Sequence, residues 1–406
     1  MPLKILLFLL FFIISNTQTL FAQNQTLQTD TTLAFHSERF LSPLNGLRTS
    51  NKGMTKFNIK YDLDNLSSKL SLHYDGYKKF TLDGSYLQYT KKIATFGVGA
   101  IDRHWSFSDN SSLILSHNAR PSKSIFLKLE NRFGYNWLPS KSNWSLEIFN
   151  GFTESSLNNI NPMLFGARAV LSPIEGLDFE FVKTSQWGGK GYNVGISGLT
   201  SAIFKDTNDN SNSNINKMAG LGISYLIRNN IMPLRIYGQA IGEDEAGGLP
   251  SCYAYLAGLE WSNAKIKYPS TVGIELIDTS TERSTHGYCG KNSIYNNNTY
   301  NYTNYGKVMG SEIDTQSTSF GLFLQSQISE KTNIKFTTKS VVINKDNWSH
   351  HRLSTKRQSG FINSLTASWS KDNINFNGDI FYQGFSLDKA DIKSGYGVGF
   401  SSSIMF

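Results

Sequence analysis

The feature of this sequence that most constrains its fold is a period-two alternation of apolar with small or polar residues. Its clearest example is the C-terminal segment SGYGVGFSSSIMF, residues 394–406. Tyr396 and Phe400 fall on one face of this segment, whereas Gly397 and Ser401 fall on the other. Successive side chains of a β-strand point to opposite faces, so the pattern predicts a strand with one apolar and one polar face.

The same alternation recurs upstream, for example in 125–132, 266–274 and 374–382. Counting such runs predicts about 18 strands, the first near Met54 and the last at Phe406. We therefore expect an all-β fold, a transmembrane antiparallel β-barrel in the outer membrane of a Gram-negative bacterium. Apolar faces would contact outer-membrane lipid, and small and polar faces would line a lumen.

The connections between these runs alternate in length. Short polar turns are predicted at 228–230, 262–263 and 371–372. Long polar tracts occupy the other junctions: 186–216, 278–315, 345–357 and 384–393. With both termini periplasmic, short turns should lie at the periplasmic end and long loops outside the cell. We expect the longest extracellular loops near 186–216 and 278–315.

The N-terminus predicts export. Lys4 precedes an apolar run from Ile5 to Ile14, and a polar stretch then leads to the small residue Ala22. This run is too short for a membrane-spanning helix, which favours a Sec signal peptide over 1–22 rather than an uncleaved anchor. Residues 23–53 would be a short periplasmic segment and 54–406 the barrel. About 30 residues are too few to pack a sizeable periplasmic helical bundle.

Composition favours a barrel over a soluble secreted protein. Aromatic residues make up 13% of the chain and charged residues 17%, with 34 Gly and 9 Pro. The formal net charge of +8 favours anionic partners but is too diffuse to indicate nucleic acid. Cys252 and Cys289 permit at most one disulfide, which would staple two loops, or they remain free thiols. No metal or cofactor is expected.

Four motifs resemble, in this order, the capsule assembly Wzi family. They are GAIDRHWSFSDNSSLILSHNARP (99–121), MLFGARAVLSP (163–173), TSQWGGKGY (184–192) and IYGQAIGEDEAGGLPS (236–251). The resemblance runs from about Gly97 to the C-terminus. It implies an outer-membrane barrel with a lectin-like role, which holds newly exported capsular polysaccharide at the cell surface. Typical members carry a periplasmic helical bundle, and a tryptophan- and glycine-rich version of what is here DRHWSFS.

Two of these motifs carry candidate sugar-binding residues. Sugars need flat aromatic faces and planar polar groups, and acidic sugars add a demand for Arg or Lys. Arg103, His104 and Trp105 offer all of these, and Asn118 and Arg120 lie one strand away. The alternative role for these residues is architectural, with Arg and Trp tied to a plug or turn.

Further candidates lie in predicted loops. Trp187, before two glycines, could stack on a sugar or belong to an interfacial girdle. Glu243, Asp244 and Glu245 could make a cation-assisted sugar contact or a loop salt bridge; adjacent carboxylates on one loop do not face each other as glycoside hydrolysis requires. The pair 350–351, both His, is predicted to be solvated.

The sequence thus predicts a non-enzymatic barrel that binds and organises capsular or exopolysaccharide. Its other partners would be outer-membrane lipid and the β-barrel assembly machinery, which would recognise the terminal aromatic residue Phe406. The alternative is a diffusion porin or glycan-conducting channel, because barrels of this size can leave an aqueous pore. A third possibility, an outer-membrane hydrolase, has no catalytic motif to support it.

Overall fold

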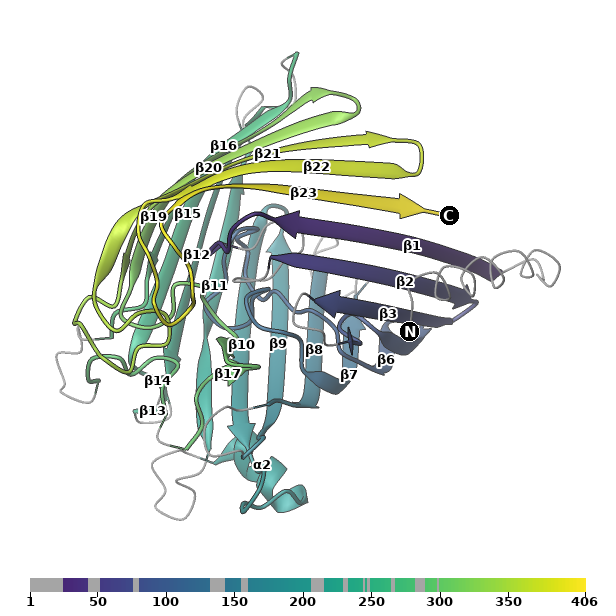
Figure 1. The fold of residues 1–406 in the computed structure, drawn as a ribbon. Helices are drawn as coiled ribbons and strands as arrows, with labels where there is room; N and C mark the ends of the chain where they lie inside the picture. The colour runs from purple at the N-terminus through teal and green to yellow at the C-terminus, as the bar shows by residue number, and fades with distance from the viewer. Residues whose placement is uncertain are drawn as a thin grey trace.

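The chain folds into a closed barrel of antiparallel strands (Figure 1). The computed structural model describes residues 25–42, 52–75, 80–131, 143–154, 160–205, 215–228, 233–243, 245–246, 249–263, 267–281, 289–297 and 299–406. The predicted signal peptide, 1–22, and the candidate residue Asp244 lie outside these residues.

Each wall strand pairs with its neighbours in chain order. The first ten segments are β1 (Gln25–His36), β2 (Gly53–Leu63), β3 (Leu66–Asp75), β4 (Phe80–Thr81), β5 (Tyr86–Lys91), β6 (Ala94–Gly99), β7 (Lys123–Glu130), β8 (Asn143–Phe152), β9 (Met163–Ile174) and β10 (Leu177–Trp187). The others are β11 (Asn216–Ile227), β12 (Leu234–Glu243), β15 (Tyr253–Asn263), β16 (Ser270–Asp278), β19 (Thr318–Ser329), β20 (Thr332–Ile343), β21 (Gln358–Lys371), β22 (Ile374–Gln383) and β23 (Gly395–Met405). Because β4 and β5 both pair with β3, they are two pieces of one strand, and the wall has 18 strands. The predicted fold class is confirmed.

The barrel closes where β1 meets β23. Asp30 to His36 of β1 pair with Met405 to Gly399 of β23, and the other edge of β1 pairs with β2. The predicted first strand near Met54 is therefore the second, and the prediction that 23–53 is a periplasmic segment is wrong. The sequence alternation of β1 was not recognised because Thr29 and Thr31 lie on the same face as Leu33, where a barrel strand is expected to carry apolar residues.

The wall has the predicted two-faced character. Phe400 on β23 is 48% exposed and points outward, whereas its neighbour Ser401 is 3% exposed and faces the lumen. Ile404 also points outward, at 37% exposed. The exposed apolar side chains on the outer surface of the wall form the band that lipid would cover.

Connections of different length separate the two ends of the barrel. Two-residue turns such as 64–65 and 372–373 lie at one end, here called the turn end. The long connections 188–215 and 279–317 lie at the other, the loop end. The first carries α2 (Ile196–Phe204), and the second carries the hairpin β17 (Thr303–Asn304) and β18 (Lys307–Val308). A second small hairpin, β13 (Glu245–Ala246) with β14 (Leu249–Pro250), also lies at the loop end.

Within the described residues, no helix has the length and apolarity needed to cross a membrane.

Two segments fold into the lumen, and we call residues 100–122 and 289–317 the plug. The two segments bond to each other: Ser116 N donates to Met309 O at 2.8 Å, and the Tyr295 hydroxyl donates to Leu113 O at 2.8 Å. Their apolar side chains share one buried cluster with wall residues such as Phe149. The lumen therefore contains a packed core rather than an open pore.

Close packing on the lumen face generates a stability prediction. Gly258 on β15 lies directly opposite Tyr237 on β12, and a Cβ at Gly258 would lie 2.2 Å from Tyr237 Cζ. We expect Gly258→Val to lower the free energy of unfolding by about 1–3 kcal/mol, because the buried ring cannot move aside. Urea unfolding in detergent micelles measures this loss.

The matched control is Gly378→Val on β22, where an added Cβ meets nothing within 4 Å. This second variant should unfold at the wild-type urea concentration. Equal stability of the two variants would contradict the packing argument.

Candidate functional site

The predicted Arg103 anchors the plug to the wall. It is 8% exposed, and its Nε donates to Glu147 Oε1 on β8 at 2.8 Å. Its guanidinium carbon lies 3.9 Å from the centre of the Phe149 ring. The Arg103 guanidinium pairs with Glu147 and stacks on Phe149 inside the protein, so it is not available to an external ligand.

Neither predicted tryptophan offers a sugar a free ring face. Trp105 is 1% exposed and packs edge-on against Phe149, with ring centres 5.5 Å apart. Trp187 is 3% exposed, and its Nε1 donates to Asn150 Oδ1 at 3.1 Å. Of the two roles left open for each residue, this burial favours the architectural one for Trp105, and it leaves Trp187 no open ring face for a sugar or for a girdle.

Arg120 and Glu243 also brace the plug. Arg120 forms two hydrogen bonds with Asp83, at 2.8 and 3.0 Å, and lies 3.9 Å from the centre of the Tyr305 ring. Glu243 is 2% exposed, and its carboxylate accepts the backbone N–H of Tyr295. Arg120 therefore fits the architectural alternative, and the Glu243 carboxylate is engaged by a plug backbone N–H.

His104 and Asn118 line the larger cavities of the lumen, whereas Arg103 and Arg120 line only a small cavity of about 20 Å³. The His104 ring stacks on His117, with ring centres 5.0 Å apart and an interplanar angle of 15°. Asn118 Nδ2 donates to Val308 O at 2.9 Å, which ties the two plug segments together. Asn118 lines both a cavity at the loop end and a second cavity deeper in the lumen.

The cavity at the loop end, here called the outer pocket, has a volume of about 260 Å³. Its lining combines four basic with three acidic residues: Arg39, Asn118, Gly306, Lys307, Val308, Glu312, Asp314, Arg352, Leu353, Lys389, Ala390 and Asp391. Arg39 pairs with Asp391, and Arg352 with Asp314. Lys389 is exposed and Lys307 is half-buried, so part of each side chain is open to solvent.

Sequence reasoning missed these four basic residues. They come from four connections that are far apart in the chain, and only the fold brings them together. Three of the four lie in polar tracts visible in the sequence, at 278–315, 345–357 and 384–393, but these tracts predicted only loops.

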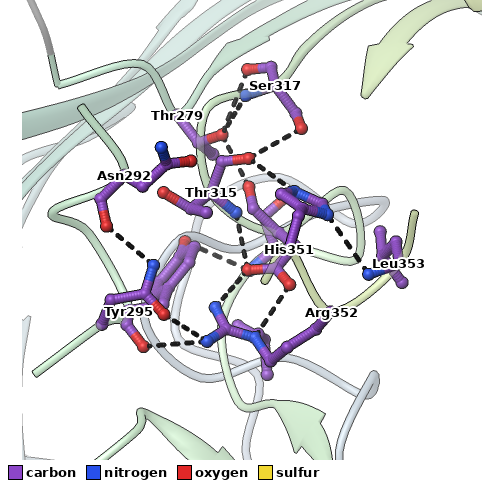
Figure 2. A network of polar contacts seen from close by, with 12 residues as sticks. Thr279, Asn292, Tyr295, Thr315, Ser317, His351, Arg352 and Leu353 are labelled. Carbon is purple, nitrogen blue, oxygen red and sulfur yellow. Dashed lines mark hydrogen bonds and ion pairs between the residues drawn. The ribbon is translucent and has the colours of Figure 1, made fainter. Parts of the chain in front are cut away.

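A buried polar network supports the floor of the outer pocket (Figure 2). Arg352 grips Asp314 with two donors and also bonds the side chain of Asn296. His351 is 1% exposed; its Nε2 lies 3.0 Å from Thr315 O, and its Nδ1 accepts Leu353 N–H at 3.2 Å. The prediction of a solvated histidine pair is therefore wrong for His351.

Burial alone would raise the pKa of Asp314. The Arg352 guanidinium, the neighbouring His351 and the Thr315 N–H outweigh burial and hold this pKa below its ordinary value. The charged form of Asp314 is therefore the form that stabilises the network.

A disulfide ties the plug to a neighbouring connection. Cys252 and Cys289 are bonded, with their Cα atoms 5.3 Å apart and their positions 37 residues apart in sequence. Cys252 immediately precedes β15, and Cys289 begins the described part of the second plug segment. The bond fixes the start of this segment close to the wall.

The Asp314 carboxylate gives a pH-dependent prediction. Its pKa is lowered in the folded protein, so its stabilisation is complete above the ordinary aspartate range and is lost as pH falls through the folded-state pKa. We expect faster hydrogen exchange of 289–317 at pH 3 than at pH 7, after correction for intrinsic rates. Asp314→Asn should exchange fast at both pH values; an unchanged pH dependence in this variant would contradict the assignment.

The disulfide gives a second prediction. Replacing both Cys252 and Cys289 with Ala should lower the free energy of unfolding by roughly 2–4 kcal/mol, because the unfolded chain gains freedom. Non-reducing peptide mapping of protein from the cell envelope should recover the joined peptides. Two free thiols in that material would rule the bond out.

Comparison with known proteins places this architecture in a family. The sequence profile of the capsule assembly protein Wzi family matches residues 16–387. A curated relative, an uncharacterised 55.8 kDa protein of the cps region of Klebsiella pneumoniae, is 24% identical over 216 residues. That match covers 51% of this chain and 42% of the relative, so the chain spans less than half of the relative's length.

Solved structures share the fold. Wzi of Escherichia coli, described as a carbohydrate-binding β-barrel of the outer membrane involved in group 1 capsule assembly, superposes with a TM-score of 0.76 at 20% identity. The match covers 93% of this chain and 84% of that protein. OccD3 of Pseudomonas aeruginosa superposes with a TM-score of 0.54 at 11% identity, covering 96% and 92% of the two chains. Since the family profile covers most of its length, the chain belongs to the capsule assembly protein Wzi family.

Proposed function

We propose that this protein is an outer-membrane, lectin-like barrel that binds and organises capsular or exopolysaccharide at the cell surface. The observation that carries this proposal is the outer pocket, a polar cavity with basic residues at the loop end of a plugged barrel. Short turns of outer-membrane barrels face the periplasm, so the loop end faces outward, where the polymer lies. Outer-membrane lipid and the assembly machinery are the other partners that we propose.

The lining of the outer pocket suits an acidic polysaccharide. Lys307 and Lys389 can donate charge-assisted hydrogen bonds to a sugar carboxylate, and the Asn118 amide lies in the same lining. Nothing within 4 Å would meet a Cβ at Gly306, so the backbone there is open to a ligand. Each contact is weak alone, but many barrels on one surface engage a repeating polymer together.

The plug favours a role in binding polymer over a role as a diffusion channel. Its buried cluster packs against the lumen face of the wall, the Arg103–Glu147 pair fixes it to the wall, and the Arg352–Asp314 pair fixes it to the connection between β20 and β21. A general diffusion porin needs a wide aqueous channel, and these contacts would have to break before such a channel could open. We also propose that the protein is not an enzyme, because the pocket carboxylates of Glu312 and Asp314 are each engaged by a cation.

A capsule-retention assay tests the proposal. In cells that make normal amounts of polymer, a Lys307→Gln/Lys389→Gln double variant should shed more polysaccharide into the medium, because two cationic contacts are lost. Surface-attached polymer, shed polymer and folded barrel are measured in the same cells. Raising the salt concentration should increase shedding from wild-type cells, since partly exposed charges are screened.

The matched control is Lys331→Gln/Lys371→Gln, which removes the same charge from exposed positions at the turn end. This control should retain polymer as the wild type does. If the Lys307→Gln/Lys389→Gln variant retains polymer normally at normal barrel levels, the outer pocket is not the polymer-binding site.

A further inference from the structure

A second cavity lies inside the lumen, and the proposed function does not use it. This inner cavity has a volume of about 190 Å³ and lies between the plug and the lumen faces of β20 and β21. His104, Asn110 and His117 line it from the plug, and Lys335, Thr337 and Ser364 line it from the wall. Hydrophilic side chains therefore surround a space that the plug leaves open along one side of the barrel.

The inner cavity is separated from the outer pocket. Asn118 and Glu312 line both cavities and so form the partition between them. Glu312 is held there by Lys339 Nζ at 2.9 Å, with both side chains almost buried. A ligand of the inner cavity must therefore enter from the other direction.

The entrance lies toward the turn end. Lys335 is the fourth residue of β20, which begins at the turn after Glu330 and Lys331. Asp109, which also lines the inner cavity, has a side chain 90% exposed, so solvent reaches this part of the lining. In an outer-membrane barrel this end faces the periplasm.

The lining has an unmatched positive group. Lys335 Nζ donates to the amide oxygen of Asn110 at 2.8 Å and forms no ion pair with any residue that the structure describes. The acidic side chains nearby are engaged elsewhere: Glu260 and the exposed Asp109 pair with Arg235, at 2.6 and 3.9 Å, and Glu275 accepts from Ser108 and Tyr237. A half-buried ammonium with a neutral partner is best complemented by an anionic oxygen from a ligand.

The remaining lining suits a sugar. Thr337 and Ser364 carry hydroxyl groups that both donate and accept, and Asn110 carries an amide. His117 is exposed beside His104 and presents a flat ring. Pockets for drug-sized ligands have volumes of about 300–1,000 Å³, so this smaller cavity limits the ligand to about one ring.

We propose that the inner cavity is a second binding site, reached from the periplasm, for a single carboxylate-bearing sugar residue. The carboxylate lies at Lys335, the hydroxyls at Thr337, Ser364 and Asn110, and the ring against His117. The choice of a sugar acid over other small anions rests on the proposed function. The ligand is either a free sugar acid or the end residue of an acidic polymer.

Binding to the full-length protein in detergent micelles tests this site, with D-glucuronate, D-glucose and acetate as probes in titration calorimetry. Wild-type protein should bind glucuronate more tightly than either glucose or acetate. Lys335→Gln should weaken glucuronate binding by about 10-fold or more, the factor that one charge-assisted hydrogen bond supplies. Lys331→Gln, four residues away on the exposed turn, should bind as the wild type does.

A second variant keeps the test independent of charge. Ser364→Leu places a larger apolar side chain in the inner cavity and should abolish glucuronate binding by filling the space. Heat-modifiable migration on gels verifies that each variant is folded. A glucuronate-terminated oligosaccharide that competes with free glucuronate identifies a polymer end as a source; failure to compete identifies the free sugar acid.

Two results would overturn the inner site. Wild-type affinity for glucuronate in folded Lys335→Gln and Ser364→Leu would exclude it. Loss of glucuronate binding in Lys307→Gln/Lys389→Gln, with retention in Lys335→Gln, would move the ligand to the outer pocket. Since capsule retention is measured separately on the outer-pocket variant, failure of the inner site leaves the proposed function standing, and the reverse also holds.

Discussion

The pairing of β1 with β23 is the interaction on which the rest of the structure depends. Inside a bilayer no water is available to bond an unpaired backbone N–H or C=O, so a membrane-spanning sheet must have no free edge. Seven residue pairs between Asp30 and His36 of β1 and their partners on β23 remove the last edge. Once the cylinder is closed, its inner face becomes a fixed surface on which the plug can pack.

The inner face then determines what the lumen contains. The wall presents carboxylates and cations to the interior, and buried charges are tolerated only when they are paired and hydrogen-bonded. Plug residues supply those partners: Arg103 for Glu147, Ser108 for Glu275 and Glu312 for Lys339. The plug is therefore electrostatically matched to this wall as well as packed against it. Where the match is incomplete, at Lys335, the inner cavity remains.

The sequence predicts the wall better than it predicts the site, for a physical reason. Strand alternation is a local pattern, so the outward position of Phe400 and the inward position of Ser401 follow from the sequence alone. β1 was missed because Thr29 and Thr31 weaken that local pattern. Motif residues such as Trp105 and Arg120 lie in the plug, and residue type alone cannot distinguish a residue that braces the plug from one that contacts a sugar. Lys389 carried no motif, because its role depends on neighbours that are distant in sequence.

One feature of the outer pocket links its existence to the completion of the barrel. Arg39 follows the first strand and Asp391 precedes the last, and the ion pair between them joins residues 352 positions apart. A chain whose seam is still open has these two residues on opposite margins of an unfinished sheet. The outer pocket thus requires the same event that closes the barrel, and a chain with an open seam lacks it. Under the proposed function, a chain whose seam is open cannot hold polymer, because the outer pocket arises only in the closed barrel.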